Sequence, residues 1–407
     1  MRRKWTNLSV YVIAIALRSA LAIYAVAWAN LEEASPSEFN SDVFEMTGCN
    51  ASTYDQLPNH PSLFIGRQFF KSNGAAFAKE EGCGPLVEEE TKRRGLVLDR
   101  LDWTQRRFSI IKPLLVPPLR IGGGPIEGAI VKAAYDPDAA LFHGEYWVAF
   151  ECVIANGRAF GIEGTSACLA PFDDVKQELR LDQVYVVVSG RREAGGVTYS
   201  ASVPTLFSDN DHLYLYWSAI TSTKASVGRE FLRVGVRGVE LLPDERGFLW
   251  AKGAGRMIYS IDPQTVEVWG PQSGDPMSDT TVGVRAVWRT SSGKIVALAG
   301  IGGAGCAKPR GPQPGCFRLA MAEADQPLGD HIFKVLPADE ESLPTNPENY
   351  TRPVKTPNGD FVFLGHFFKP AVNGFSETHP VPEKWDHLRG AEVVAFPFSD
   401  KALWPSD

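Results

Sequence analysis

One structural phrase recurs along the chain: an apolar strand, a turn that holds Gly, Asp or Asn, and a second strand rich in aromatic residues. Its clearest copy spans residues 135–142, a turn at His143-Gly144, and residues 146–150. Further copies begin at Ser202, Thr281 and Tyr350. Strand pairs repeated at intervals of some tens of residues are typical of radial or solenoid β architecture, because each unit buries its face only against its neighbours. We therefore expect an all-β chain folded as a β-propeller.

The spacing of the copies predicts the number of blades. If Pro137, Pro204, Val284 and Pro353 are equivalent positions, the intervals are 67, 80 and 69 residues, which suits four-stranded blades with long loops. The strands before Tyr135, or the terminal run at residues 392–396, complete a fifth blade. We expect five blades, with six as the alternative.

The first residues have the pattern of an export signal. A basic start, residues 1–4, leads into an apolar stretch that ends in Ala27-Trp28-Ala29. Arg18 interrupts this stretch and disfavours a permanent membrane span, because a charge near the middle of a bilayer is costly. Residues 1–29 are thus predicted to be a signal peptide of a secreted or periplasmic protein without stable membrane insertion, with an uncleaved anchor as the alternative.

The remainder divides by composition. Residues 30–95 are rich in Glu, Ser, Asn and Gly and show no sustained alternation, so we expect an irregular N-terminal extension there. From residue 96 to residue 407 short apolar runs alternate with Gly, Pro and Asn, which predicts the propeller domain.

If the protein is exported, its cysteines are expected to form disulfides, because the compartment is oxidising. The chain has six, an even set that suggests up to three disulfides among fifteen connectivities. The simplest assignment pairs sequence neighbours. The most favoured pair is Cys306 with Cys316, which would close the Pro- and Gly-rich loop between them. The cysteines are Cys49, Cys83, Cys152, Cys168, Cys306 and Cys316.

The sequence lacks the features that several functional classes require. The formal net charge of −7 argues against a nucleic-acid partner, which requires a basic face. Residues 300–305 match G-x-G-x-x-G, but the Pro-containing segment that follows cannot begin the helix a dinucleotide site needs. The histidines form no zinc-binding pattern, and no serine lies in G-x-S-x-G. We expect chemistry without a metal or cofactor.

Asp136 and Asp138 are the most suggestive acidic residues. Residues two apart in a strand face the same side, so both carboxylates can point toward the central channel. Pro137 between them is tolerated only at the start or edge of a strand. The alternative is an Asp-Pro pair that merely caps the beginning of a strand.

The chain resembles a known superfamily at these residues. Residues 136–139 with Tyr146-Trp147, residues 160–166, and residues 202–204 with 213–218 are similar to five-bladed propeller glycosidases, which include arabinanases, xylosidases, invertases and levansucrases. The resemblance covers roughly residues 100–400. It implies a carbohydrate substrate and a pair of carboxylates at the channel mouth, one to protonate the leaving oxygen and one to activate water or attack the anomeric carbon.

The resemblance also implies roles for particular residues. Asp136 matches the base or nucleophile, with Asp138 as its rival, and Asp279 matches an Asp that tunes the acid. Where the superfamily places the acid of the next blade, this chain has Val203 and Thr205.

The general acid must therefore come from elsewhere. Glu163 is our choice over Glu348, and Glu151 is a further acid of the same blade as Glu163. The departure leaves open a propeller that binds glycans or protein without catalysis, or one with a purely structural role.

Four further residues are candidates for contacting a sugar. Arg352, and Arg285 at an analogous position, could bind a hydroxyl or carboxylate with the planar guanidinium. Trp147 and Trp217 could stack on a sugar ring, although aromatic residues in the middle of propeller strands usually pack between blades.

Overall fold

The computed structural model places almost all described residues in short strands and tight turns. The chain divides into two units, residues 1–41 and 42–407, and every described residue belongs to the second. The described residues are 42–46, 54–71, 73–76, 93–122, 127–155, 165–192, 196–225, 228–261, 281–302, 317–335, 349–350, 352–366, 393–397 and 401–405. The expected signal peptide lies outside them. None of their helical segments is long and apolar enough to cross a membrane.

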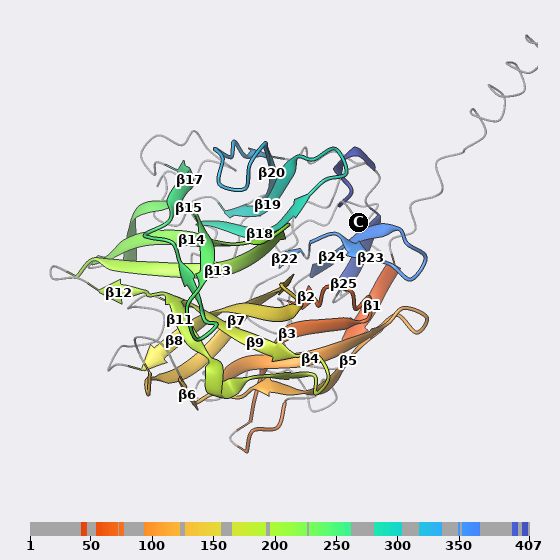
Figure 1. Ribbon diagram of the computed structural model, residues 1–407, viewed down its shortest axis with the longest axis horizontal. Helices are drawn as coiled ribbons and strands as arrows, with labels where there is room; N and C mark the ends of the chain where they lie inside the picture. The colour runs from red at the N-terminus through yellow and green to blue at the C-terminus, as the bar shows by residue number, and fades with distance from the viewer. Residues whose placement is uncertain are drawn as a thin grey trace, which may run out of the picture. The chain divides into compact units, whose positions relative to one another are not determined.

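The strands form five blades in chain order (Figure 1). Blade 1 comprises β2 (Tyr54–Gln56), β3 (Leu63–Phe69), β4 (Arg94–Asp102) and β5 (Arg107–Leu115). Blade 2 comprises β6 (Leu119–Arg120), β7 (Ile130–Phe142), β8 (Glu145–Ala155), β9 (Ser166–Asp173), β10 (Glu178–Leu179) and β11 (Tyr185–Val188). Blade 3 comprises β12 (Arg191–Arg192), β13 (Thr198–Asp209), β14 (His212–Ala225), β15 (Gly228–Pro243), β16 (Leu249–Ala251) and β17 (Arg256–Ile261).

The last two blades are formed mainly by the C-terminal part of the chain. Blade 4 comprises β18 (Thr281–Arg289), β19 (Ile295–Gly302), β20 (Phe317–Ala324) and β21 (Lys334–Val335). Blade 5 comprises β22 (Asn349–Tyr350), β23 (Val354–Lys355), β24 (Phe361–His366), β25 (Val393–Pro397) and, from the other end of the unit, β1 (Asp42–Met46).

β1 closes the ring. It pairs antiparallel with β25 and, through Glu45 and Met46, parallel with β5, so that blades 5 and 1 share one hydrogen-bonded sheet. The other neighbours meet through their inner strands, with β7 against blade 1, β13 against β7, β18 against β13, and β22 against β18. The expected five-bladed propeller is confirmed, and the terminal run near Val393 belongs to the fifth blade.

The expected irregular extension at residues 30–95 is wrong for its described part. β1, β2 and β3 lie within that range and supply the closing strand and half of blade 1. These strands have five, three and seven residues. β3 is buried on both faces, so its sequence lacks the alternation of apolar and polar residues that indicates a half-buried strand.

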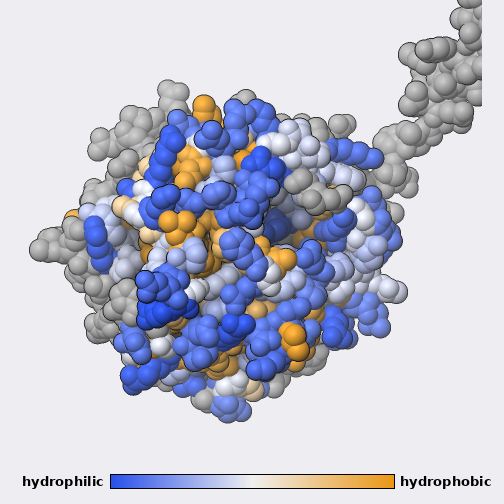
Figure 2. All heavy atoms as spheres, in the orientation of Figure 1, coloured by the Kyte–Doolittle hydropathy of each residue, from blue (hydrophilic) through white to orange (hydrophobic). Residues whose placement is uncertain are grey.

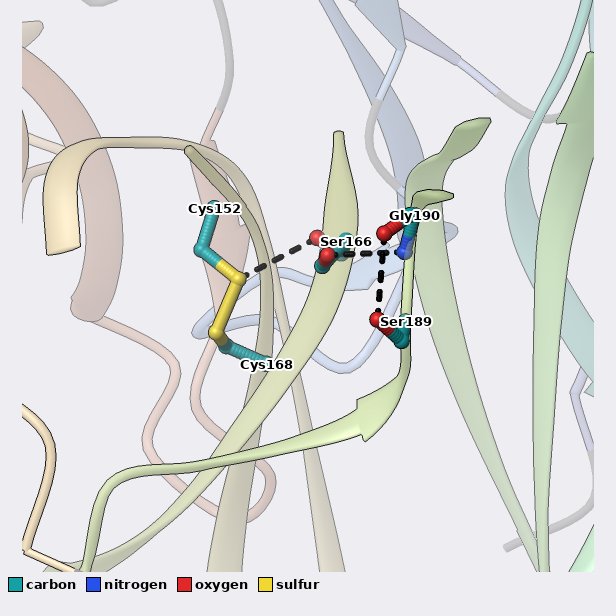
Figure 3. Close-up of a disulfide and its surroundings, with 5 residues drawn as sticks. All are labelled: Cys152, Ser166, Cys168, Ser189 and Gly190. Atoms are coloured by element: carbon teal, nitrogen blue, oxygen red, sulfur yellow. Dashed lines mark hydrogen bonds between the residues drawn. A yellow bond between two sulfur atoms is a disulfide. The ribbon is translucent and has the colours of Figure 1, made fainter. Parts of the chain in front are cut away.

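A disulfide joins two strands of blade 2. Cys152 on β8 and Cys168 on β9 are bonded across the sheet (Figure 3). This confirms that these two sequence neighbours pair, whereas the other four cysteines lie outside the described residues. At the start of β9, the Ser166 hydroxyl accepts a hydrogen bond of 2.8 Å from the backbone N–H of Gly190, which ties the end of the β11 segment to the same corner.

Polar side chains at matching positions link each inner strand to the next. A carboxylate oxygen of Asp55 on β2 accepts the backbone N–H of Ala139 on β7 at 2.9 Å. Asp138 on β7 likewise accepts the N–H of Leu206 on β13 at 3.1 Å. Thr205, which lies beside Leu206 on β13, donates its hydroxyl to the carbonyl of Val284 on β18 at 2.8 Å. These contacts fix the positions of four successive blades relative to one another along the propeller axis.

Arg352 completes this belt from blade 5. Its Nε donates to Asp55 at 3.1 Å, and its Nη2 lies 3.0 Å from the second oxygen of Asp55 and also hydrogen-bonds Asp138. Burial raises the pKa of both carboxyls, and the guanidinium opposes that rise. Arg352, Asp55 and Asp138, here called the interblade latch, therefore join blades 5, 1 and 2.

Replacing the cation of the latch should destabilise the fold strongly. In Arg352→Met two buried carboxylates lose their counter-charge, which costs about 3–5 kcal/mol of unfolding free energy at neutral pH. The deficit should shrink as the pH falls toward 4, because protonation of Asp55 and Asp138 removes the unpaired charges. Urea denaturation of wild type and variant at several pH values measures this.

The matched control is Arg246→Met, which breaks a surface pair between Arg246 and Asp244 whose guanidinium side chain is 65% exposed. It should change the unfolding free energy by less than about 1 kcal/mol. Equal losses in the two variants would contradict a structural role for the latch.

Asp99 on β4 is a buried carboxyl whose Oδ2 has no hydrogen-bond partner among the described residues. Its side chain covers Gly66, where an added Cβ would lie 2.4 Å from that oxygen. Burial raises the pKa of Asp99 to about 7. The folded state therefore holds a proton that the unfolded chain releases at lower pH.

Wild-type stability should consequently fall as the pH rises from about 4 to about 7, and the loss should be complete above that range. Asp99→Asn cannot ionise, so it should gain stability relative to wild type at pH 8, by at most about 4 kcal/mol, and much less at pH 4. Thermal or urea unfolding at the two pH values measures the difference. Asp211→Asn, at a side chain that is 95% exposed, should show no such dependence.

Candidate active site

The inner strands of three blades, β7, β13 and β18, each have a β-bulge that interrupts the hydrogen-bonded pairing with the next strand. In β7 the pairs Tyr135–Glu151 and Asp138–Ala149 are consecutive, which leaves Asp136 bulged out of the sheet. β13 has the same irregularity at Val203, and β18 has one at Arg285. Asp136 and Val203 have positive φ angles of 44° and 51°, an unusual backbone conformation that a β-branched valine adopts only under strain. Bulges of this kind redirect a side chain out of its strand.

Asp136 lies where separate blades meet. One carboxylate oxygen is 3.8 Å from a guanidinium nitrogen of Arg67 on β3, and the other is 3.5 Å from one of Arg285 on β18. These residues belong to blades 2, 1 and 4. Because blades 2 and 4 are not neighbours in the ring, such a contact requires all three side chains to converge near the propeller axis. Their side chains keep 12%, 15% and 20% of their surface exposed.

Glu151 is the second carboxyl of this site. It lies on β8 opposite Tyr135, and its carboxylate accepts the backbone N–H of Val203 at 3.0 Å. Burial and, after it, the negative charge of Asp136 raise the pKa of Glu151 to about 7. The hydrogen bonds from Val203 and Thr165 and the charge of Arg285 oppose this rise. Glu151 therefore keeps its proton to a higher pH than a glutamate on the surface would.

An aromatic ring and a third arginine flank the carboxyls. The guanidinium of Arg94 on β4 lies 5.4 Å from the ring centre of Tyr135 and 5.0 Å from that of Phe69. Burial raises the pKa of Tyr135, so its phenol is neutral. Arg94 therefore places a positive charge on the ring of Tyr135, the residue before Asp136.

The structure brings together only some of the residues that the sequence singled out. Asp136 and Arg285 converge in the site. Asp138 and Arg352 belong instead to the interblade latch, where Asp138 is 3% exposed. Burial and hydrogen bonds to two blades favour a structural role for both, so neither has a direct part in the chemistry proposed below.

Trp147 and Trp217 are 3% and 4% exposed and lie in the hydrophobic core shared by blades 1, 2 and 3. Trp217 packs so closely on Gly255 that an added Cβ there would lie 2.4 Å from the indole. The structure thus shows the packing between blades that was the alternative to a sugar-stacking role. Glu163, Asp279 and Glu348 lie outside the described residues, and their catalytic roles stay predictions.

Arg67 and Arg94 were not identified from the sequence, and Glu151 was only a secondary acid. Arg67 and Arg94 belong to the range expected to be irregular, so nothing marked them as inner-face residues. The bulge at Asp136 could not be foreseen, although its Asp-Pro pair hinted at a broken ladder. In the described part of the chain, no three His, Cys, Asp or Glu side chains are grouped in a way that could hold a metal ion.

No protein-family model and no curated protein matches this chain. Solved structures of family-43 glycoside hydrolases, which are five-bladed propellers, match it over most of its length at low identity. A thermostable family-43 glycoside hydrolase is 14% identical, with 86% of this chain and 90% of that chain covered and a TM-score of 0.48. An endo-arabinase from Bacteroides thetaiotaomicron is 12% identical, with 88% and 99% covered and a TM-score of 0.47. The Bacillus subtilis arabinanase is 12% identical, with 90% and 98% covered and a TM-score of 0.46. At these values the fold assignment rests on the strand pairing described above.

Proposed function

We propose that this protein is a glycoside hydrolase in which Glu151 is the general acid and Asp136 the opposing carboxylate. The observation that carries the proposal is the position of Glu151, a buried carboxyl held by the backbone N–H of Val203 and close enough to Asp136 for that residue to help raise its pKa to about 7. Two interacting carboxyls whose environments separate their protonation states supply an acid and a base at one pH. Glycoside hydrolysis requires that combination.

The chemistry follows from these two groups. Glu151 gives its proton to the glycosidic oxygen while the bond from that oxygen to the anomeric carbon breaks. Asp136 takes a proton from the water that attacks this carbon, or attacks it directly and is released by water in a second step. In either course one water is consumed, and the proton returns to Glu151 from solvent or from the hydrolytic water.

Val203 explains why the acid comes from an unexpected strand. The resemblance places an acid near this position, but here the side chain is apolar and the backbone N–H instead holds Glu151. The strained backbone of Val203 points that N–H at the carboxyl, which orients Glu151 and limits the rise of its pKa. Glu151 from β8 thereby takes the part that a side chain of β13 would otherwise play.

Export is part of the proposal. The N-terminal pattern of residues 1–29 and the disulfide between Cys152 and Cys168 both suit a secreted or periplasmic protein, because disulfides persist in oxidising compartments. The substrate is an oligo- or polysaccharide.

Glu151→Gln should abolish most turnover of an unactivated glycan. Loss of a general acid lowers kcat by about 10²–10⁴-fold. In wild type, kcat/KM should fall as the pH rises through about 7, because Glu151 then loses its proton. On an aryl glycoside with an acidic phenol as leaving group, the variant should lose much less activity, since that oxygen needs little protonation. A glycan and aryl-glycoside screen with pH profiles measures this.

Glu145→Gln is the control, since Glu145 is in the same blade and, among the described residues, forms an ion pair with Arg180 on the surface. It should keep wild-type kinetics. If full activity remains in Glu151→Gln while Asp136→Asn is inactive, another group is the acid.

Asp136→Asn should also lower the pKa of Glu151, because the charge that helps to raise it is removed. NMR titration of the carboxyl carbon of Glu151, with the Glu151→Gln spectrum as assignment, measures the shift without need of a substrate. Asp211→Asn should leave the titration unchanged. An unshifted pKa in Asp136→Asn would show that the two carboxyls do not interact.

A second candidate is a propeller that binds glycans without cleaving them, which the apolar Val203 favours. Wild-type binding of glycans with no turnover of either substrate class would select it. A protein partner is less favoured by the visible surface. Hydrophilic residues cover most of the face in Figure 2, and the large hydrophobic side chains exposed among the described residues come from separate segments, namely Ile111, Val175, Leu242 and Ile332.

A further inference from the structure

Among the described residues, the side chains around Asp136 carry more positive than negative charge. Arg67 and Arg285 both face the single carboxylate of Asp136, and Arg94 lies on the ring of the preceding Tyr135. Glu151 is largely neutral below pH 7. This excess is local, because the chain as a whole has a net charge of −7. A neutral sugar would leave the excess uncompensated.

The geometry of these pairs differs from that of the structural ion pairs. Arg289 binds Asp209 through Nε and Nη2 at 2.7 and 2.5 Å, so both components of its fork are engaged. Arg285 approaches Asp136 only to 3.5 Å and donates no hydrogen bond to any described residue. Gly283 packs against this side chain, since an added Cβ there would lie 3.4 Å from Nε of Arg285, while 20% of the Arg285 side chain stays exposed. The fork of Arg285 is therefore able to bind a further acceptor.

We propose that the protein recognises a sugar that carries a carboxylate, and that Arg285, assisted by Arg67, binds that carboxylate beside Asp136. The inference rests on the proposed function, because it names the substrate class of the same site. A guanidinium binds a carboxylate through two parallel hydrogen bonds, which a hydroxyl cannot reproduce. The partial exposure of both arginines leaves them reachable from solvent. A uronic acid unit within a glycan has the required chemistry.

The test compares acidic glycans with the same glycans after their charge is removed. Tetragalacturonate and a glucuronic-acid-substituted xylotetraose, each beside its methyl ester, are titrated into the full chain by calorimetry at about pH 6, where Glu151 is protonated. At least one acid should bind tenfold or more tightly than its ester, and the preference should weaken as salt is added.

Arg285→Met should reduce affinity for that acid by about ten- to a hundredfold and leave affinity for the ester nearly unchanged. Arg67→Met should show the same pattern with a smaller loss, and it remains informative if the first variant fails to fold. Arg246→Met, which removes an equal charge from the surface of blade 3, should bind like wild type. Thermal melting confirms the fold of each variant.

The outcomes separate this inference from the proposed function. Preferential binding of the acid without hydrolysis of any glycan would support the carboxylate site and overturn the glycosidase proposal. Hydrolysis of neutral glycans with equal binding of acids and esters would do the reverse. Absence of any preference for either acid, or a preference that survives in both Arg285→Met and Arg67→Met, overturns the inference.

Discussion

The contact on which the rest of the structure depends is the ion pair of Arg352 with Asp55 and Asp138. The buried hydrophobic side chains among the described residues form separate clusters, one of them shared by blades 1, 2 and 3, so the ring as a whole is held together where neighbouring faces meet. β1 closes the ring at its edge, between β25 and β5. Nearer the inner strands the same closure depends on Arg352 of blade 5, whose single guanidinium neutralises carboxylates of blades 1 and 2. Burying two acids around one cation is favourable only when further hydrogen bonds compensate, and the N–H groups of Ala139 and Leu206 each donate one, to Asp55 and to Asp138.

The latch also explains the position of the candidate site. Asp138 is anchored in the interface between blades, so the chain just before it must leave the ladder, and Asp136 is the residue that the bulge displaces. Thr205 is anchored in the same manner after the bulge at Val203. In each of these strands one residue is held between two blades, and the residue displaced by the bulge just before it turns toward the propeller axis. Because the arrangement repeats from blade to blade, the displaced side chains converge near the axis. Of the two aspartates that the sequence presents as equals, one therefore stabilises the ring and the other is available for chemistry.

The sequence predicted the architecture well because repetition is visible without knowledge of packing. The Asp-Pro, Val-Pro and Arg-Pro pairs at residues 136, 203 and 352 marked repeated positions in three blades, and the Cys152–Cys168 pairing followed from sequence order. The first half of blade 1, β2 and β3, was missed because these strands are short or buried on both faces, and with it Asp55 and Arg67. Arg94, at the start of β4, lies in the same range that was expected to be irregular. The division of labour between Asp136 and Asp138 depends on a register shift. In an unbroken strand the two side chains would face the same way, so only the structure separates them.

Recognition of a charged sugar and acid catalysis would be coupled through Arg285. In the free protein Arg285 lowers the pKa of Glu151, whereas Asp136 and burial raise it. A ligand carboxylate on Arg285 would cancel much of that positive charge and would bring its own negative charge close to Glu151. Both effects favour the protonated form, as does the exclusion of water by the sugar. Binding of the correct substrate would then secure the proton that its own cleavage requires, while a neutral sugar would contribute only the exclusion of water and would leave the charge of Arg285 in place. Glu151 would thus be most fully protonated when a ligand carboxylate binds beside Arg285.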